Sequence, residues 1–118
     1  MDRSFAAALG LVAGLGFATF ENAFYGMVDI NTTLLRALSA APLHGACGIR
    51  VATAVFIAGQ DPQRKIPPKA IFLFLSAVLI HGAYNLIISS PILPSALAII
   101  IAFAALLSSL FSMSDTPH

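Results

Sequence analysis

Ala70–Ser89 reads AIFLFLSAVLIHGAYNLIIS, a stretch of 20 residues without a charged side chain. About 20 apolar residues are enough for an α-helix to cross the hydrocarbon core of a bilayer. Within this stretch His81 and Asn85 stand four positions apart, so both side chains lie on one face of a helix. Polar, titratable residues at such a depth are rare and usually functional. The stretch therefore predicts a membrane-spanning helix that carries part of a functional site.

The composition of the whole chain indicates a membrane protein. Of its 118 residues, 58% are hydrophobic and 9% are charged, and the mean hydropathy is +0.92. A net charge of +1 gives no strong basic field, so we expect no nucleic-acid partner. Cys47 is the only cysteine and cannot form an internal disulfide, so we interpret it as a small apolar residue of a span.

Four apolar stretches are each long enough to cross a bilayer: residues 5–28, 34–59, 70–89 and 92–111. In lipid, a stretch of this length can satisfy its own backbone hydrogen bonds only as a helix. We therefore predict an all-α, polytopic membrane bundle of four transmembrane helices in a single domain. Pro91 and Pro94 leave only a short link before the last stretch, so the third and fourth helices should be adjacent and antiparallel.

Basic residues predict the orientation in the membrane. Arg64, Lys65 and Lys69 cluster between the second and third stretches, which favours a cytoplasmic position for this link. With four spans, both termini should then lie in the cytoplasm, together with Arg3. Arg36 is left as the one basic residue flanking a span on the outer side. We predict a multi-pass protein of the cell membrane with both termini cytoplasmic.

Small residues recur at every fourth position of three spans. The rows are Ala6, Gly10, Gly14 and Ala18 in the first span, Ala37, Ala41 and Gly45 in the second, and Ala98 and Ala102 in the fourth. Asn22 continues the first row. Ridges of this kind allow helix backbones to approach closely where lipid provides no hydrophobic driving force. We expect the helices to pack along these rows.

Three polar residues on different spans share one depth. Each is eight residues from the outer end of its span: Glu21 before Asp29, His44 after Arg36, and His81 before Ser89. At a rise of 1.5 Å per residue, this places each about 12 Å inside the outer boundary. We predict that Glu21, His44 and His81 converge in one polar pocket in the outer half of the bundle.

Arg50 lies near the centre of the second span, where a charge costs at least about 2.5–3.5 kcal/mol. We therefore expect it to have an acidic partner, either Glu21 or a group outside this chain.

A carboxylate with two imidazoles is a ligand set that zinc accepts, with a position left open for water. Water bound in this way would be a nucleophile for peptide hydrolysis. The same groups could act without metal, with a carboxylate as general base and His81 with Asn85 holding an oxyanion. The spacing of these residues does not distinguish the metal-dependent mechanism from the metal-free one. HExxH, Gly-rich phosphate loops and Gly-x-Ser-x-Gly are all absent from the sequence, which removes soluble-protease and nucleotide-binding interpretations.

Three segments resemble one protein family. Residues 14–25 (GLGFATFENAFY) resemble the GxGFAxxENxxY stretch of PrsW-type intramembrane metalloproteases. Residues 36–45 (RALSAAPLHG) resemble the family's segment with Arg and Leu followed by Pro-x-His, and residues 81–85 (HGAYN) resemble its HGxYN. The order and spacing fit over roughly residues 8–90. The family is related to the CAAX prenyl endopeptidases and bacteriocin-processing proteins, which share a helical membrane core.

The resemblance implies peptide-bond hydrolysis of membrane-bound protein substrates, such as anti-sigma factors, in a bacterial cell membrane. It places five residues at motif positions of the catalytic centre: Glu21, Asn22, His44, His81 and Asn85. Glu21, His44 and His81 are the candidate ligands of a divalent metal, with zinc as the expected ion.

The family's first motif, Glu-Glu-x-x-Lys on a preceding membrane helix, has no counterpart here, since Glu21 is the only glutamate. We therefore expect the chain to be the C-terminal part of a larger protease core, inactive by itself. Two alternatives stay open. The protein could be a non-catalytic membrane scaffold or binding protein of the same superfamily. It could also be a small transporter in which Glu21, His44 and His81 form a relay.

Overall fold

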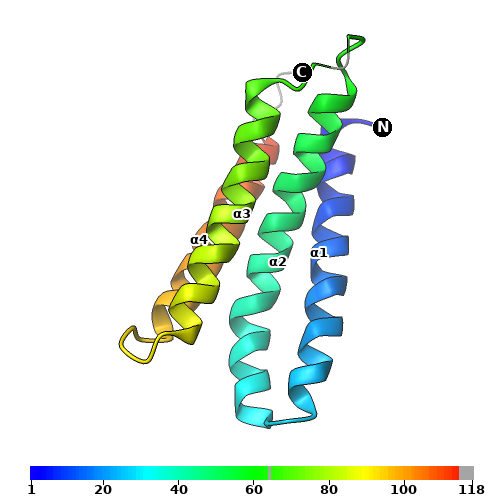
Figure 1. Cartoon of the computed structure of the whole chain (residues 1–118). Helices are drawn as coiled ribbons and strands as arrows, with labels where there is room; N and C mark the ends of the chain where they lie inside the picture. The colour runs from blue at the N-terminus through cyan, green and yellow to red at the C-terminus, as the bar shows by residue number, and fades with distance from the viewer. Residues whose placement is uncertain (64, 115–118) are drawn as a thin grey trace.

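The computed structural model describes residues 1–63 and 65–114, apart from the side chains of Thr32 and Ser114. The described residues form four α-helices joined by short links (Figure 1): α1 (Arg3–Gly26), α2 (Ile30–Gly59), α3 (Pro68–Ser89) and α4 (Ala96–Ser114). All four are long and apolar enough to cross a membrane. The predicted all-α bundle with four transmembrane helices is confirmed.

Helix α2 begins four residues earlier than the predicted span, at Ile30. The reason is a turn at Asp29, whose carbonyl oxygen accepts the N–H of Thr33 at 3.1 Å. The Asp29 carboxylate also accepts the N–H of Asn31 at 3.4 Å. Satisfying such free N–H groups allows a helix to start among polar residues.

Helix α4 begins four residues later than predicted, at Ala96. Pro94 disfavours a helical conformation at the residue before it, so the helix cannot start at residue 92. The N–H groups of Ile92 and Leu93 instead bond to the Ser90 hydroxyl, each at 3.3 Å. The link between α3 and α4 is therefore a turn of six residues, 90–95.

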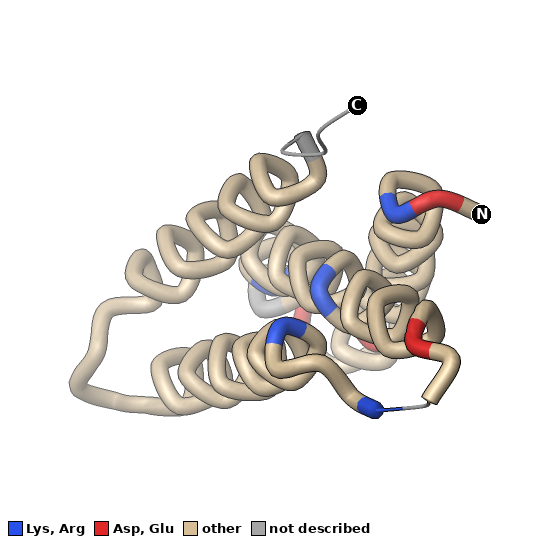
Figure 2. The backbone as a smooth tube through the Cα atoms, turned by 90° about the horizontal axis from the view of Figure 1, so that it is seen from above, with Lys and Arg blue, Asp and Glu red and all other residues tan. Residues whose placement is uncertain are grey.

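Helix α2 is the centre of the bundle and packs against α1, α3 and α4 (Figure 2). Helices α3 and α4 are antiparallel, as expected, but they contact each other far less than each contacts α2. A buried cluster shows why. Tyr84 of α3 and small residues of α4 both pack against Leu43 of α2, each of them at most 1% exposed. Side chains of α2, Leu43 above all, thus occupy the space between α3 and α4.

The close packing of α1 on α2 depends on glycines. A Cβ on Gly10 would overlap the carbonyl oxygen of Gly48, and a Cβ on Gly14 would overlap that of His44. The predicted row on α1 is therefore confirmed as the helix contact. On α2 the prediction is partly wrong, because Ala37 is exposed and Gly48 makes the closest approach. The backbone of α1 lies directly beside the turn of α2 that carries His44.

Helix α1 begins and α4 ends at the same end of the bundle as the α2–α3 link (Figure 1). The basic residues Lys65 and Lys69 belong to this end, while Arg64 lies outside the described residues. Because the number of spans is even, the start of α1 and the end of α4 lie on the same side of a membrane. The basic residues predict that this side is cytoplasmic.

Cysteine labelling tests this orientation. In a Cys47→Ala background, a membrane-impermeant maleimide added outside intact cells should label Asn31→Cys and should not label Gln63→Cys. Both side chains are exposed at opposite ends of α2, so reactivity reports the side of the membrane alone. Gln63→Cys should react after permeabilisation, which is the control. Labelling of Gln63→Cys in intact cells would reverse the predicted orientation.

Candidate functional site

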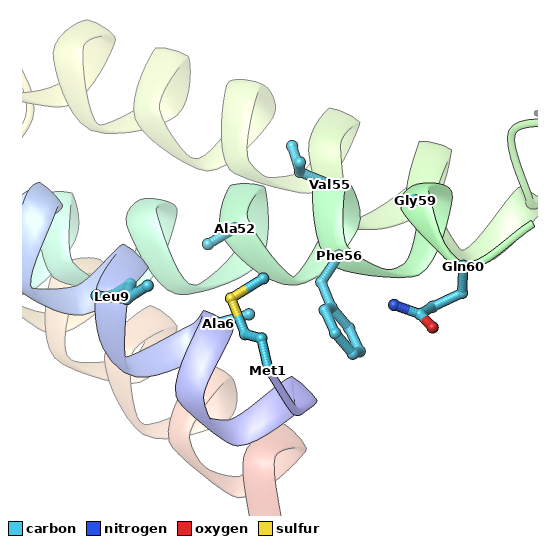
Figure 3. A pocket seen from close by; sticks show the side chains of 8 residues that line it. All are labelled: Met1, Ala6, Leu9, Ala52, Val55, Phe56, Gly59 and Gln60. Carbon is cyan, nitrogen blue, oxygen red and sulfur yellow. The ribbon is translucent and has the colours of Figure 1, made fainter.

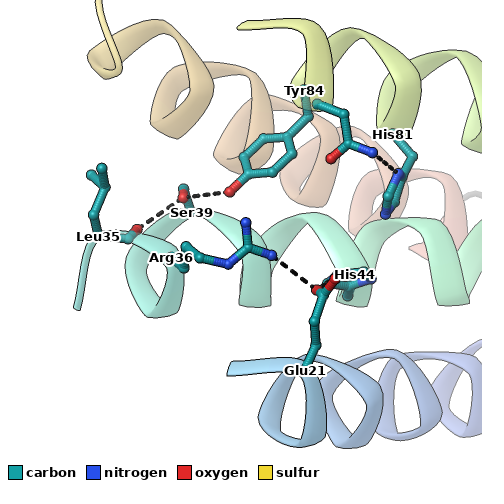
Figure 4. Close-up of polar contacts among 8 residues, drawn as sticks. Glu21, Leu35, Arg36, Ser39, His44, His81 and Tyr84 are labelled. Carbon is teal, nitrogen blue, oxygen red and sulfur yellow. Dashed lines mark hydrogen bonds and ion pairs between the residues drawn. The ribbon is translucent and has the colours of Figure 1, made fainter. Parts of the chain in front are cut away.

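Glu21, on α1, is bonded to two residues of α2 (Figure 4). Its Oε2 lies 2.9 Å from Nε2 of His44 and 3.1 Å from Nη2 of Arg36. An ionised carboxylate only accepts hydrogen bonds, so both nitrogens donate. Arg36 and His44 are 9% and 8% exposed, whereas the Glu21 side chain is 32% exposed. The ion pair compensates the charges of both partners, which lowers the cost of placing them in a membrane.

His81, on α3, approaches the same place from the other side of α2 (Figure 4). Its ring lies edge-on to that of His44, with centroids 5.1 Å apart. Its Nδ1 is 3.2 Å from the amide Nδ2 of Asn85, one helical turn further along. With this amide nitrogen donating, a neutral His81 carries its hydrogen on Nε2. Glu21, His44 and His81 thus meet as predicted, with His44 in the middle, while a single polar pocket shared by all three stays a prediction.

Two further contacts hold the helices around this cluster. The guanidinium of Arg36 lies over the ring of Tyr25, 3.7 Å from its centroid, on the helix that carries Glu21. Tyr84 and Ser39 join α3 to α2 by a buried hydrogen bond of 2.8 Å. The Ser39 hydroxyl donates to the carbonyl oxygen of Leu35, so Tyr84 is the donor in that pair. These contacts restrict how α1 and α3 can rotate against α2.

Asn22 does not join the cluster. It follows Glu21 directly, and successive residues of an α-helix point about 100° apart. Its Oδ1 is buried and has no hydrogen-bond partner among the described residues. The resemblance predicts Asn22 at the catalytic centre, and that role stays a prediction.

Arg50 does not pair with Glu21, so that alternative is wrong, while an acidic group outside this chain stays a prediction. Glu21 is occupied by Arg36 and His44, and Arg50 bonds to serine hydroxyls of α3 and α4 instead. The physical reason is depth, because Arg50 lies six residues, or about 1.7 turns, further along α2 than His44.

A groove of about 460 Å³ opens beside His81, between α2 and α3. Its other walls are largely apolar and include Cys47 and Val78. Cys47 behaves as the expected small side chain, with its thiol 3.6 Å from the carbonyl oxygen of Ala77. His81 therefore both contacts His44 and lines this groove.

A second groove, of about 500 Å³, lies between α1 and α2 near the start of α1 (Figure 3). Its walls include Met1, Leu9 and Phe56, and no Asp, Glu, His or Cys side chain lines it. It is far along α1 from Glu21 and is therefore separate from the cluster around His44.

The three predicted metal ligands do not fit a metal in their present arrangement. The atoms that would bind it, Oε2 of Glu21 and Nε2 of His44, are bonded to each other, and Arg36 donates to the same oxygen. Among residues 1–63 and 65–114, no group of three or more His, Cys, Asp or Glu side chains could hold a metal ion. The chemistry of the donors suits zinc, but their geometry is that of a hydrogen-bonded cluster.

Sequence reasoning missed the position of Arg36. We expected it to flank the span on the outer side, but it is buried and paired with Glu21. One signal could have found it, because Tyr25 lies one turn after Glu21 on the same helix face and offers an aromatic ring to a cation.

Comparison of the chain with known proteins gives a family. A model of the PrsW family intramembrane metalloproteases matches residues 5–110. No curated protein and no solved structure matches the chain. The matched region includes all three segments that resembled the family and every residue of the cluster around His44. The family is named for metal-dependent proteolysis within the membrane, which suggests a divalent metal and membrane-bound substrates. The chain belongs to the PrsW family of intramembrane metalloproteases.

Proposed function

We propose that the protein forms part of the catalytic centre of an intramembrane protease that hydrolyses peptide bonds of membrane-bound proteins. One observation carries this proposal. His81 contacts His44, which is bonded to Glu21, and it also faces the groove between α2 and α3. An extended substrate segment lying in that groove would meet an imidazole backed by a charged network.

His81 is suited to the role of an oxyanion donor. Asn85 donates to its Nδ1, so the hydrogen of the neutral ring sits on Nε2. That N–H could donate to the carbonyl oxygen of the scissile peptide as negative charge develops on it. Donors arranged in advance of the reaction, at a site without bulk water, stabilise such charge strongly. Asn85 would act through His81 as a positioning residue.

Glu21, His44 and Arg36 would hold the cluster in place. The ion pair fixes the Glu21 carboxylate, and the carboxylate in turn fixes the ring of His44 against that of His81. Glu21 is not among the residues that line the groove beside His81. We therefore propose that the base that activates water is a different carboxylate, and the Glu-Glu-x-x-Lys motif that the resemblance implies is the candidate.

Zinc at Glu21, His44 and His81 stays a prediction that the observed arrangement does not support. The substrate class that the resemblance suggests, a membrane-bound protein similar to an anti-sigma factor, is likewise proposed.

A cleavage assay tests the proposal. The 118-residue chain, reconstituted in vesicles with a single-span substrate tagged at both ends, should give no measurable cleavage. General-base catalysis contributes about 10²–10⁴-fold, so a chain without the base should be nearly inactive. Adding an N-terminal membrane helix that bears Glu-Glu-x-x-Lys should produce cleavage, which separation of the two tags would reveal.

Two outcomes would contradict the proposal. Robust cleavage by the 118-residue chain, lost in Glu21→Gln, would make Glu21 the base. Failure of both the short and the extended chain would favour the non-catalytic scaffold.

A further inference from the structure

A second polar site lies at the end of the bundle where α1 begins and α4 ends. Arg3, Arg50 and Lys69 line a pocket of about 260 Å³ there, together with Phe72, Leu73 and Ser112. The three basic residues come from α1, α2 and α3, so the site exists only in the folded bundle. None of them contributes to the cluster around His44.

Arg50 is held in this pocket by neutral groups alone. Its Nε donates to Ser109 at 3.0 Å, Nη1 to Ser76 at 2.9 Å, and Nη2 to Ser108 at 2.8 Å. Each of these hydroxyls donates its own hydrogen to a backbone carbonyl oxygen, which leaves its lone pairs for Arg50. The guanidinium is therefore fixed in orientation by α3 and α4.

The charge of Arg50 has no carboxylate to balance it among the described residues. A guanidinium has five N–H donors, and the three serines use three of them. A charge at this depth without a counter-charge is costly. Arg50 therefore keeps two N–H donors for an acceptor other than these three serines.

Arg3 also has an N–H group without an acceptor among the described residues. Its Nη2 donates to the carbonyl oxygen of Ser112 at 3.0 Å, while its Nε is buried and has no hydrogen-bond partner in the described chain. The neighbouring carboxylate of Asp2 caps α1 by accepting the N–H of Phe5 at 2.7 Å. Lys69, in the first turn of α3, adds a third cation at the rim.

We propose that this pocket binds a phosphate-bearing anion, supplied by the headgroup of an anionic phospholipid. Arginine fits phosphate oxygens with paired N–H donors, and the free donors of Arg50 and Arg3 are of this kind. The pocket is walled by membrane-spanning helices and includes the exposed ring of Phe72, which suits a headgroup with acyl chains attached. Basic pockets between transmembrane helices on the cytoplasmic side are known to select such headgroups.

Native mass spectrometry of the full 118-residue chain in detergent tests the proposal. Added phosphatidylglycerol should stay bound, and phosphatidylcholine should not. In detergent only basic residues that line the pocket can reach the bound headgroup, and each such residue should contribute about fivefold to the affinity, the size seen for Lys and Arg near anionic lipid. Arg3→Gln and Lys69→Gln should therefore each weaken binding about fivefold, and about 25-fold together.

Lys65→Gln is the matched control, because it removes the same charge from an exposed residue that does not line the pocket. The affinity of the Lys65→Gln protein for phosphatidylglycerol should be unchanged. Lys69 is exposed, so its replacement leaves the packed core intact. Equal weakening by Lys65→Gln, or no preference for phosphatidylglycerol over phosphatidylcholine, would overturn the lipid assignment. Binding of inorganic phosphate without that preference would identify a soluble phosphate as the ligand instead.

Discussion

Replacing His81 by Ala should lower the cleavage rate by about 10²–10³-fold in the form of the protein that cleaves its substrate. Loss of one oxyanion donor has an effect of this size, because it acts on charge that exists only in the transition state. The loss should therefore appear in kcat, with KM little changed. Cleavage of a tagged membrane substrate, followed over time at several substrate densities, measures both quantities.

Leu79→Ala is the control for this experiment. Leu79 lies on the same helix and is 71% exposed, away from the cluster. The Leu79→Ala protein should therefore cleave the substrate at the rate of the unchanged protein. Asn85→Ala should give a smaller loss than His81→Ala, since it frees the ring to turn but leaves the donor present. An unchanged rate in a folded His81→Ala protein would show that the cluster does not take part in catalysis.

Gly14→Ala should destabilise the bundle by about 1–3 kcal/mol, the usual cost of forcing extra volume into a packed interior. The new Cβ would overlap the carbonyl oxygen of His44, and backbone cannot move aside as a flexible side chain can. Helices α1 and α2 would have to separate at the turn that carries His44. Equilibrium unfolding in mixed detergent, followed by circular dichroism, measures the loss.

Gly16→Ala is the matched control on the same helix, because nothing lies within 4 Å of its added Cβ. It should leave stability unchanged or raise it slightly, since Ala favours the helix over Gly. Gly14→Ala should also lengthen the Glu21–His44 contact and so lower cleavage. Equal stability of the two variants would show that α1 and α2 are packed less closely than the structure has them.

The four helices, and the level of each residue along them, could be predicted from the amino-acid sequence alone. Both follow from the length of apolar stretches and the fixed rise of a helix, and these do not depend on packing. The common depth of Glu21, His44 and His81 could therefore be predicted residue by residue. Helix boundaries were predicted less well, because Asp29 and Pro94 act through local hydrogen bonds and sterics that hydropathy does not register.

Which residues meet, by contrast, depends on how the helices pack against one another. Depth is a distance along the chain, whereas the direction in which a side chain points depends on how each helix rotates against its neighbours. The glycine contact between α1 and α2 sets that rotation, and it brings Glu21 to Arg36 and His44 rather than to Arg50. Arg50 lies about 1.7 turns further along α2 than His44 and bonds to serines from two other helices. A linear pattern cannot contain this choice, because the partners come from helices whose relative rotation is fixed by close packing alone.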